Sequence, residues 1–165
     1  VIARLLEKEG VENYMILIGG VVVVKGVNQN GVCWRTGINL PEDDPDGIKN
    51  NYDEMVQLCK KGAIATSGNY RNFYIKDGKK YAHTIDPRTG YPAEQSVLSA
   101  TIVANDCMTA DAYATAFMAM GLEKARQMAD SLPEIEYYVI YADENGKHQI
   151  EYSKGMLQYL PKRKQ

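Results

Sequence analysis

The sequence lacks the features that mark several classes of protein. It has no apolar run near the length of a membrane-spanning helix, no internal repeat and no low-complexity segment. Its formal net charge is only −2, and the one basic cluster, residues 162–164, lies at the end of the chain. Because surfaces that bind nucleic acid carry strong positive charge, we expect no nucleic acid as a partner.

Cysteine is also scarce. The three cysteines, Cys33, Cys59 and Cys107, cannot all pair with one another, and none lies in a Cys-x-x-Cys spacing. We expect buried thiols that pack as small apolar side chains. On this interpretation the cysteines do not define a redox compartment.

What is present suffices for one domain, over residues 1–165, with an ordinary apolar fraction of 45%. The chain has no initiator methionine and opens inside a helical pattern, so we expect a fragment of a longer protein. Tyrosine is abundant, with twelve residues against two phenylalanines. Since tyrosines often line clefts, this excess hints at a flat aromatic ligand.

Patterns of apolar residues predict helices over residues 1–9, 108–120 and 123–131. They predict strands over residues 14–18, 21–24, 32–38, 62–66, 70–75, 79–84, 97–104, 137–141 and 149–152. Residues 28–31 predict a hairpin turn whose return strand is 32–38, and residues 41–47 a surface loop. Residues 51–60 fit a helix or an irregular strand, and residues 156–160 a short strand or turn. Hairpins and helices without regular alternation predict an α+β fold, a mostly antiparallel sheet with helices packed on it.

Asp111 and Thr115 form the first candidate site. Residues four apart share one face of a helix, so this carboxylate and hydroxyl can hold one hard cation such as Mg²⁺. The alternative is an ordinary helix, in which the carboxylate favours the macrodipole and the threonine bonds back to a carbonyl. The small residues around them, including Ala114, leave room for a ligand.

His83 is the second candidate, as a general base or acid. It precedes a rigid polar turn, residues 86–90, that contains Asp86 and ends a strand. Such turns display side chains at a sheet edge or cleft, although a lone histidine is more often a structural hydrogen-bonding group.

Ser67 and Gly68 are the third candidate, because hydroxyls and amides before a glycine can cradle a phosphate. An ordinary transition from strand to loop is the alternative. The glycines Gly19, Gly20 and Gly26 permit close backbone approach but do not form a dinucleotide fingerprint.

In their order and separation, these segments resemble the ApbE family of FAD:protein FMN transferases. The segments that carry the resemblance are residues 14–20, 25–26, 34–38, 65–70, 83–90 and 108–115. The resemblance implies a transferase that binds FAD and Mg²⁺ and moves FMN to a threonine of an acceptor protein; some relatives hydrolyse FAD instead.

By motif match, the resemblance implies that Asp111 and Thr115 are Mg²⁺ ligands and that His83 is catalytic. It further implies cofactor contacts at Ser67, Gly68, His83, Ile85 and Ala114. For the full-length parent it implies a membrane-anchored lipoprotein of the bacterial periplasm.

The departures from the family concern length and the segment around the Gly-Gly pair. The family's chain is about twice as long, so this sequence corresponds to its carboxy-terminal half and we expect little activity from it alone. Val21 stands where the family has an acidic residue, and the apolar segment from residue 16 to residue 24 (Ile16 to Val24) could be covered by a second copy in a homo-oligomer. Two hypotheses therefore stay open: half of a flavin transferase, or a truncated or engineered non-catalytic scaffold of the same fold.

Overall fold

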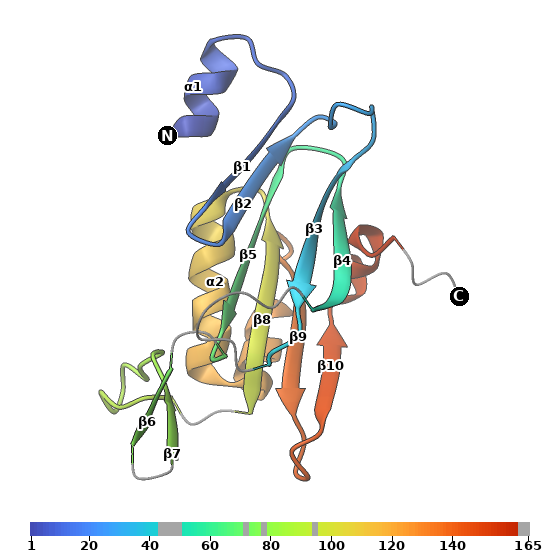
Figure 1. The fold of residues 1–165 in the computed structure, drawn as a ribbon. Coiled ribbons are helices and arrows are strands. Elements are labelled where there is room, and N and C mark those ends of the chain that lie inside the picture. The colour runs from blue at the N-terminus through green and yellow to red at the C-terminus, as the bar shows by residue number, and fades with distance from the viewer. Residues whose placement is uncertain (43–50, 71–72, 77–78, 94–95, 162–165) are drawn as a thin grey trace.

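The computed structural model describes residues 1–161 except 43–50, 71–72, 77–78 and 94–95 (Figure 1). Its elements run in the order α1 (Ile2–Lys8), β1 (Tyr14–Ile18), β2 (Val21–Lys25), β3 (Trp34–Asn39), β4 (Tyr52–Leu58), β5 (Gly62–Gly68), β6 (Phe73–Lys76), β7 (Lys79–Ala82), β8 (Val97–Ala104), α2 (Cys107–Met120), α3 (Leu122–Ala129), β9 (Glu136–Ala142), β10 (His148–Tyr152) and the 3₁₀-helix η1 (Lys154–Tyr159). Part of the predicted loop 41–47 and of the turn after β6 lies outside the described residues.

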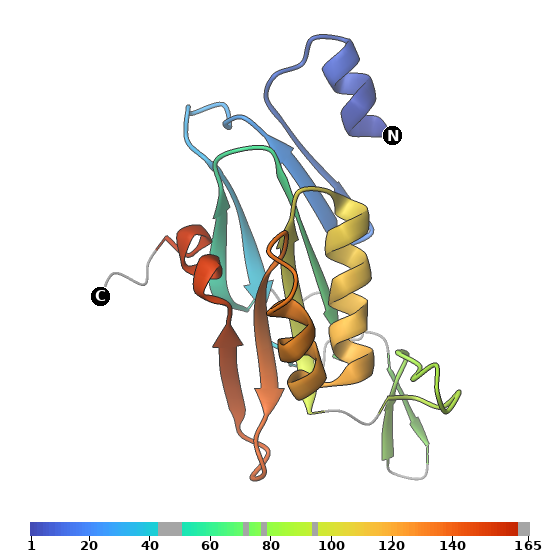
Figure 2. The ribbon, with the colours of Figure 1, turned by 180° about the vertical axis from the view of Figure 1, so that it is seen from behind.

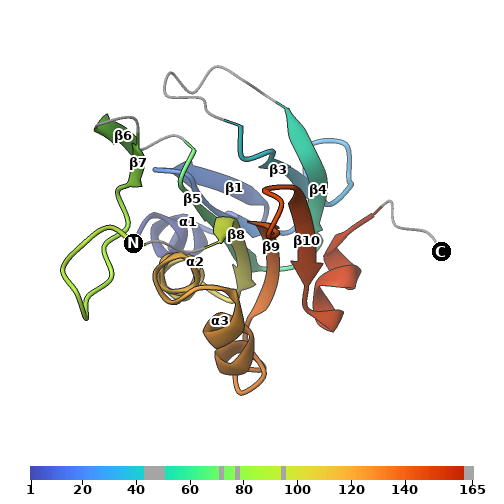
Figure 3. The same ribbon diagram turned by 90° about the horizontal axis from the view of Figure 1, so that it is seen from below.

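The centre of the fold is a six-stranded sheet in the order β1-β2-β5-β8-β9-β10, in which every neighbouring pair is antiparallel. Helices α2 and α3 cover one face, as Figure 2 shows, and the small β3–β4 sheet lies over the other face (Figure 3). A second two-stranded sheet, β6–β7, projects beyond the end of β5 (Figure 1). The predicted α+β architecture with a mostly antiparallel sheet is confirmed.

Small residues determine how closely α2 packs on the sheet. Ala110 and Ala114 of α2 are fully buried against alanines of β5 and β8, among them Ala63 and Ala100. Alanine on alanine lets the helix approach closely, and Phe117 fills the remaining space lower down the helix. This packing determines which face of α2 is left exposed beside β5.

The other face of the sheet has its own core. Ile38 of β3 and Val56 and Leu58 of β4 are buried against Ile64 and Tyr138 of the central strands. The two-stranded sheet is therefore held by a full apolar layer and forms a fixed wall above β5.

The expectation that residues 32–38 return beside residues 21–24 is wrong. The turn forms, with the Asn28 amide donating to the carbonyl of Val32 at 2.8 Å, but β3 pairs with β4. Strand β2 already has β1 on one edge and β5 on the other, so it has no free edge for a third partner. Residues 51–60 accordingly form a strand, and residues 156–160 fall mostly in η1.

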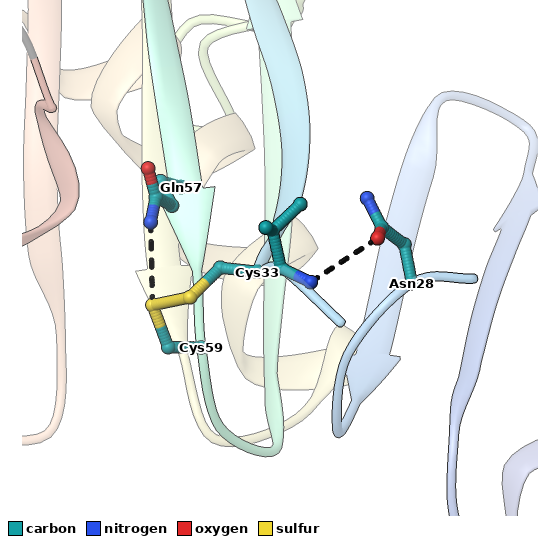
Figure 4. The surroundings of a disulfide bond; sticks show 5 residues. Asn28, Cys33, Gln57 and Cys59 are labelled. Carbon is teal, nitrogen blue, oxygen red and sulfur yellow. Dashed lines mark hydrogen bonds between the residues drawn. A yellow bond between two sulfur atoms is a disulfide. The ribbon is translucent and has the colours of Figure 1, made fainter. Parts of the chain in front are cut away.

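The expectation of three thiols is also wrong, because Cys33 and Cys59 form a disulfide (Figure 4). They flank the paired residues Trp34 and Leu58, so the register of β3 and β4 sets them opposite each other with Cα atoms 4.4 Å apart. Cys107, at the start of α2, is a free and partly buried thiol. Among the described residues, no helix combines the length and apolar character needed to cross a membrane.

Candidate functional site

The candidate site lies where β5 extends beyond the end of its ladder with β2. Strand β5 pairs with β8 from Ala63 to Gly68, but its ladder with β2 ends at Ala65, opposite Val21. The last residues of β5 therefore extend past the β1–β2 turn. A cavity of about 630 Å³ lies at this position, between the β1–β2 turn, the β3–β4 wall and α2.

Five of the predicted site residues line this one cavity, namely Ser67, Gly68, His83, Asp111 and Thr115. They come from the end of β5, from the segment after β7 and from the first half of α2. The structure thus brings together three candidate motifs that are separate in sequence.

Asp111 and Thr115 of α2 line the cavity because the apolar face of the helix packs on the sheet. Ala110 and Ala114 face the sheet, so Asp111 and Thr115 stay exposed along the adjacent face. The hydroxyl oxygen of Thr115 lies 3.3 Å from that of Ser67 on β5. A helix and a strand therefore contribute neighbouring hydroxyl groups to the same spot.

The start of α2 is held by a capping residue. The carboxylate of Asp106 accepts hydrogen bonds from the backbone amide of Thr109 at 3.0 Å and from its hydroxyl at 2.9 Å. These two bonds hold the pKa of Asp106 below its usual range, and the bond from the backbone amide of Thr109 has the larger effect. The cap defines the first turn of α2, one turn before Asp111.

Two predicted cofactor contacts lie outside the lining of the cavity. The side chain of Ala114 is fully buried in the core beneath α2. Ile85 is 48% exposed, in the segment that follows His83. Contacts of these two residues with a cofactor stay predictions.

The turn after His83 is braced by Asp86 and Arg88. The Arg88 guanidinium donates to both carboxylate oxygens of Asp86, at 3.0 and 2.6 Å, and the Arg88 backbone amide donates to the same carboxylate at 2.9 Å. The hydrogen bonds from Arg88 lower the pKa of Asp86 to about 2. Asp86 is therefore ionised at neutral pH, and its carboxylate braces the turn that follows the histidine.

Sequence reasoning missed the opposite wall of the cavity. Thr36, Gly37, Asn39 and Tyr52 of the β3–β4 sheet line it. No local pattern in the sequence predicts that β3 and β4 form this wall. Their position depends on β3 leaving the central sheet and pairing with β4 over its other face. Gly19 and Gly20, flagged for close backbone approach, do line the cavity.

The oxygen-rich side of the cavity fits a hard divalent cation. Asp111 offers a carboxylate, and Thr115 and Ser67 offer hydroxyls, which is the donor chemistry that Mg²⁺ prefers. In the part of the chain that the structure describes, no cluster of three or more His, Cys, Asp or Glu residues occurs.

Comparison with known proteins agrees with this geometry. The sequence matches the ApbE family over residues 1–139. It is 42% identical to the FAD:protein FMN transferase of Vibrio cholerae over 133 residues, which is 79% of this chain and 38% of the relative. It is 40% identical to the Escherichia coli K12 protein of the same name over 127 residues, or 77% of this chain and 35% of that protein.

Solved structures give the same result. The flavin transferase ApbE from Vibrio cholerae superposes with a TM-score of 0.80 at 37% identity, covering 96% of this chain and 48% of that one. The ApbE protein of Thermotoga maritima gives a TM-score of 0.73 at 31% identity, covering 90% and 45%. The chain therefore spans about half the length of these structures, and less of the curated relatives.

Proposed function

The chain belongs to the ApbE family, and we propose that its cavity forms part of the site of a Mg²⁺-dependent FAD:protein FMN transferase. The observation that carries the proposal is the convergence of Ser67, His83, Asp111 and Thr115 on one cavity from three separate segments. The relatives' name supplies FAD as the substrate and a protein as the acceptor.

In the proposed reaction, the hydroxyl oxygen of an acceptor threonine attacks the phosphorus of the FMN half of FAD. A new phosphorus–oxygen bond forms, the pyrophosphate bond breaks, and AMP leaves. A ring nitrogen of His83 accepts the proton of the attacking hydroxyl as that bond forms. Replacing the threonine by water gives FMN and AMP by the same route.

The other residues position the substrate for this attack. Ser67 and Gly68 orient phosphate oxygens through hydroxyl and backbone groups at the exposed end of β5. Asp111 and Thr115 would hold Mg²⁺, which screens the diphosphate charge and polarises the attacked phosphorus. Asp86 and Arg88 keep the turn after His83 rigid, which limits the positions the imidazole can take.

Release of AMP from FAD in the presence of Mg²⁺, followed by chromatography, tests the proposal. We expect little release from the chain alone, because it spans about half of its relatives. We expect release when the portion of the Vibrio cholerae enzyme that this chain does not match is supplied as a second polypeptide. His83→Ala abolishes that release and His148→Ala, at an exposed histidine starting β10, does not.

Absence of Mg²⁺-dependent AMP release in the reconstituted mixture, with both polypeptides folded, would contradict the proposal. Equal AMP release by His83→Ala and His148→Ala would contradict only the proposed role of His83 and would leave the rest of the proposal standing.

The disulfide bears on the compartment. Disulfides persist in oxidising compartments and are rare in the bacterial cytosol. The Cys33–Cys59 bond thus supports a location such as the periplasm. Fractionation of cells that express the full-length parent, with detection of this chain by mass spectrometry, tests the location.

Self-association is the second candidate function of the fold. Strand β1 is the outer strand of the sheet, and its Leu17 and Ile18 are 63% and 59% exposed. We propose that a second copy covers this edge when no other chain does. Light scattering tests this: we expect a dimer that Ile18→Lys converts to monomer, and a monomer at all concentrations would contradict it.

A further inference from the structure

The β3–β4 wall of the cavity contains an aromatic residue, Tyr52, to which the proposed function assigns no role. Tyr52 lies at the start of β4, lines the cavity and is 52% exposed. Its side chain is therefore accessible to a ligand in the cavity where the proposed substrate binds.

The position of this ring depends on a glycine. A Cβ atom on Gly37 would lie 2.1 Å from Cδ1, 2.4 Å from Cε1 and 2.7 Å from Cγ of Tyr52. Three ring atoms at such distances show that the ring lies directly against the Gly37 backbone. Any larger residue at position 37 would displace it.

The strand register keeps the ring there. Tyr52 pairs with Asn39, while Gly37 pairs with Met55, and the register shifts between Ile38 and Asn39. The shift sets Tyr52 diagonally across from Gly37. Buried Ile38, between these positions, holds this part of β3 on the core.

The two sides of the cavity differ in chemistry. The side made by Ser67, Asp111 and Thr115 offers hydroxyl and carboxylate oxygens, which suit a metal-bound diphosphate. Among the residues that the structure describes, the lining on the β3–β4 side is Thr36, Gly37, Asn39 and Tyr52, and none of these four is charged. Leu17, which is 63% exposed, adds apolar surface to the lining nearby. A ligand with a diphosphate and a flat ring satisfies both sides when its ring lies on this wall.

We propose that Tyr52, supported by Gly37, is the stacking platform for a planar aromatic ring of the bound dinucleotide. The proposal rests on the proposed function, because it takes FAD as the ligand. FAD carries two such rings, the isoalloxazine and the adenine, and both share the flat π-face that a tyrosine recognises. Tyr52 acts as a binding and positioning residue and takes no part in proton transfer.

The test measures binding of FAD, FMN and ADP separately, by calorimetry with Mg²⁺, to the full chain and its variants. We expect Tyr52→Leu to bind FAD about tenfold more weakly, the loss typical of removing one stacked ring. Tyr52→Phe keeps the ring over Gly37 and retains near wild-type affinity. The control is Tyr91→Leu, at a tyrosine that is 74% exposed and outside the cavity lining.

The separate ligands identify the ring. If the isoalloxazine stacks on Tyr52, FMN binding weakens with FAD binding, ADP binding is unchanged, and flavin fluorescence that is quenched in the wild type recovers in Tyr52→Phe. If the adenine stacks there, ADP binding weakens with FAD binding and FMN binding is unchanged. Either pattern supports the platform.

Folded Tyr52→Leu protein that binds all three ligands as the wild type does would overturn the proposal, and the ring would then serve only to cover Gly37. Wild-type protein that binds none of the three would overturn it as well. Tyr52→Thr, a residue suited to strands, replaces the leucine variant if circular dichroism shows that variant to be unfolded. Because binding is read directly, the result stands whether or not AMP is released.

Discussion

Ser67 on β5 and Thr115 on α2 place their hydroxyl oxygens 3.3 Å apart. One lies at the end of a strand that outruns its neighbour, the other on the exposed face of a helix packed through alanines. This contact joins the two halves of the candidate site. It depends on core packing, so we expect the site to be sensitive to changes that shift α2 or the sheets around it.

The Cys33–Cys59 disulfide is expected to stabilise the two-stranded sheet that forms the β3–β4 wall of the cavity. It closes a loop with a sequence separation of 26 residues. The chain-entropy relation gives about 3 to 4 kcal/mol for a loop of this size, so Cys33→Ala with Cys59→Ala lowers the free energy of unfolding by about 2–4 kcal/mol. Urea denaturation measures the loss.

Cys107→Ala is the control for the disulfide, because it removes the free thiol, and its effect is expected to be below about 1 kcal/mol. A thiol assay of the denatured protein without reductant gives one thiol per chain if the disulfide is present. Three thiols per chain would contradict it.

The Asp86–Arg88 brace gives a pH dependence with a defined sign. The pKa of Asp86 is about 2 in the folded chain, below the ordinary value of about 4. A lowered carboxyl pKa stabilises the fold above the ordinary value, and this stabilisation is lost as pH falls from about 4 to about 2. Arg88→Gln raises the pKa of Asp86 towards its ordinary value, so the pH-dependent stabilisation becomes smaller and less of it is lost between about pH 4 and pH 2.

Carbon-detected NMR titration of the Asp86 carboxyl between pH 1.5 and about 6 measures the shift. Arg35→Gln, at an exposed arginine of β3, leaves the titration unchanged. An Asp86 midpoint near 4 in the wild type would contradict the brace.

The capping residue of α2 is expected to stabilise the helix that carries Asp111 and Thr115. Asp106→Ala removes the acceptor for the Thr109 amide and hydroxyl. Loss of such a cap lowers the free energy of unfolding by about 1 kcal/mol. Urea denaturation measures it against Glu144→Ala, an exposed residue of the β9–β10 turn; equal stability of the two variants would argue against the cap.

Local patterns in the sequence predicted much of the fold. An apolar run predicted β8, a turn between two apolar runs predicted the β9–β10 hairpin, and the helical pattern predicted α2 to within a residue of its start at Cys107. The i, i+4 spacing of Asp111 and Thr115 correctly predicted one shared exposed face. These features depend on neighbours along the chain, which the sequence displays directly.

The predictions that were wrong concern features set by contacts between residues far apart in the sequence. The partner of β3 is decided by which edges of β2 are already occupied, and no local signal near residue 34 records that. The Cys33–Cys59 bond follows from the same register, so it was missed together with it. Tyr52 was missed as a cavity-lining residue because its position depends on its contact with Gly37, a residue of the neighbouring strand.

Calorimetric titration of FAD into the full chain, with and without Mg²⁺, tests the central claim that Asp111 and Thr115 hold the cation beside the dinucleotide. Loss of even an outer partner of a metal lowers affinity by about 10–100-fold, so loss of a ligand should cost at least about tenfold. We predict that Mg²⁺ tightens FAD binding to the wild type and to the control Asp130→Asn, an exposed aspartate at the end of α3. The same Mg²⁺ effect is lost in Asp111→Asn and reduced in Thr115→Val. A folded Asp111→Asn protein that keeps the full Mg²⁺ effect would contradict the account.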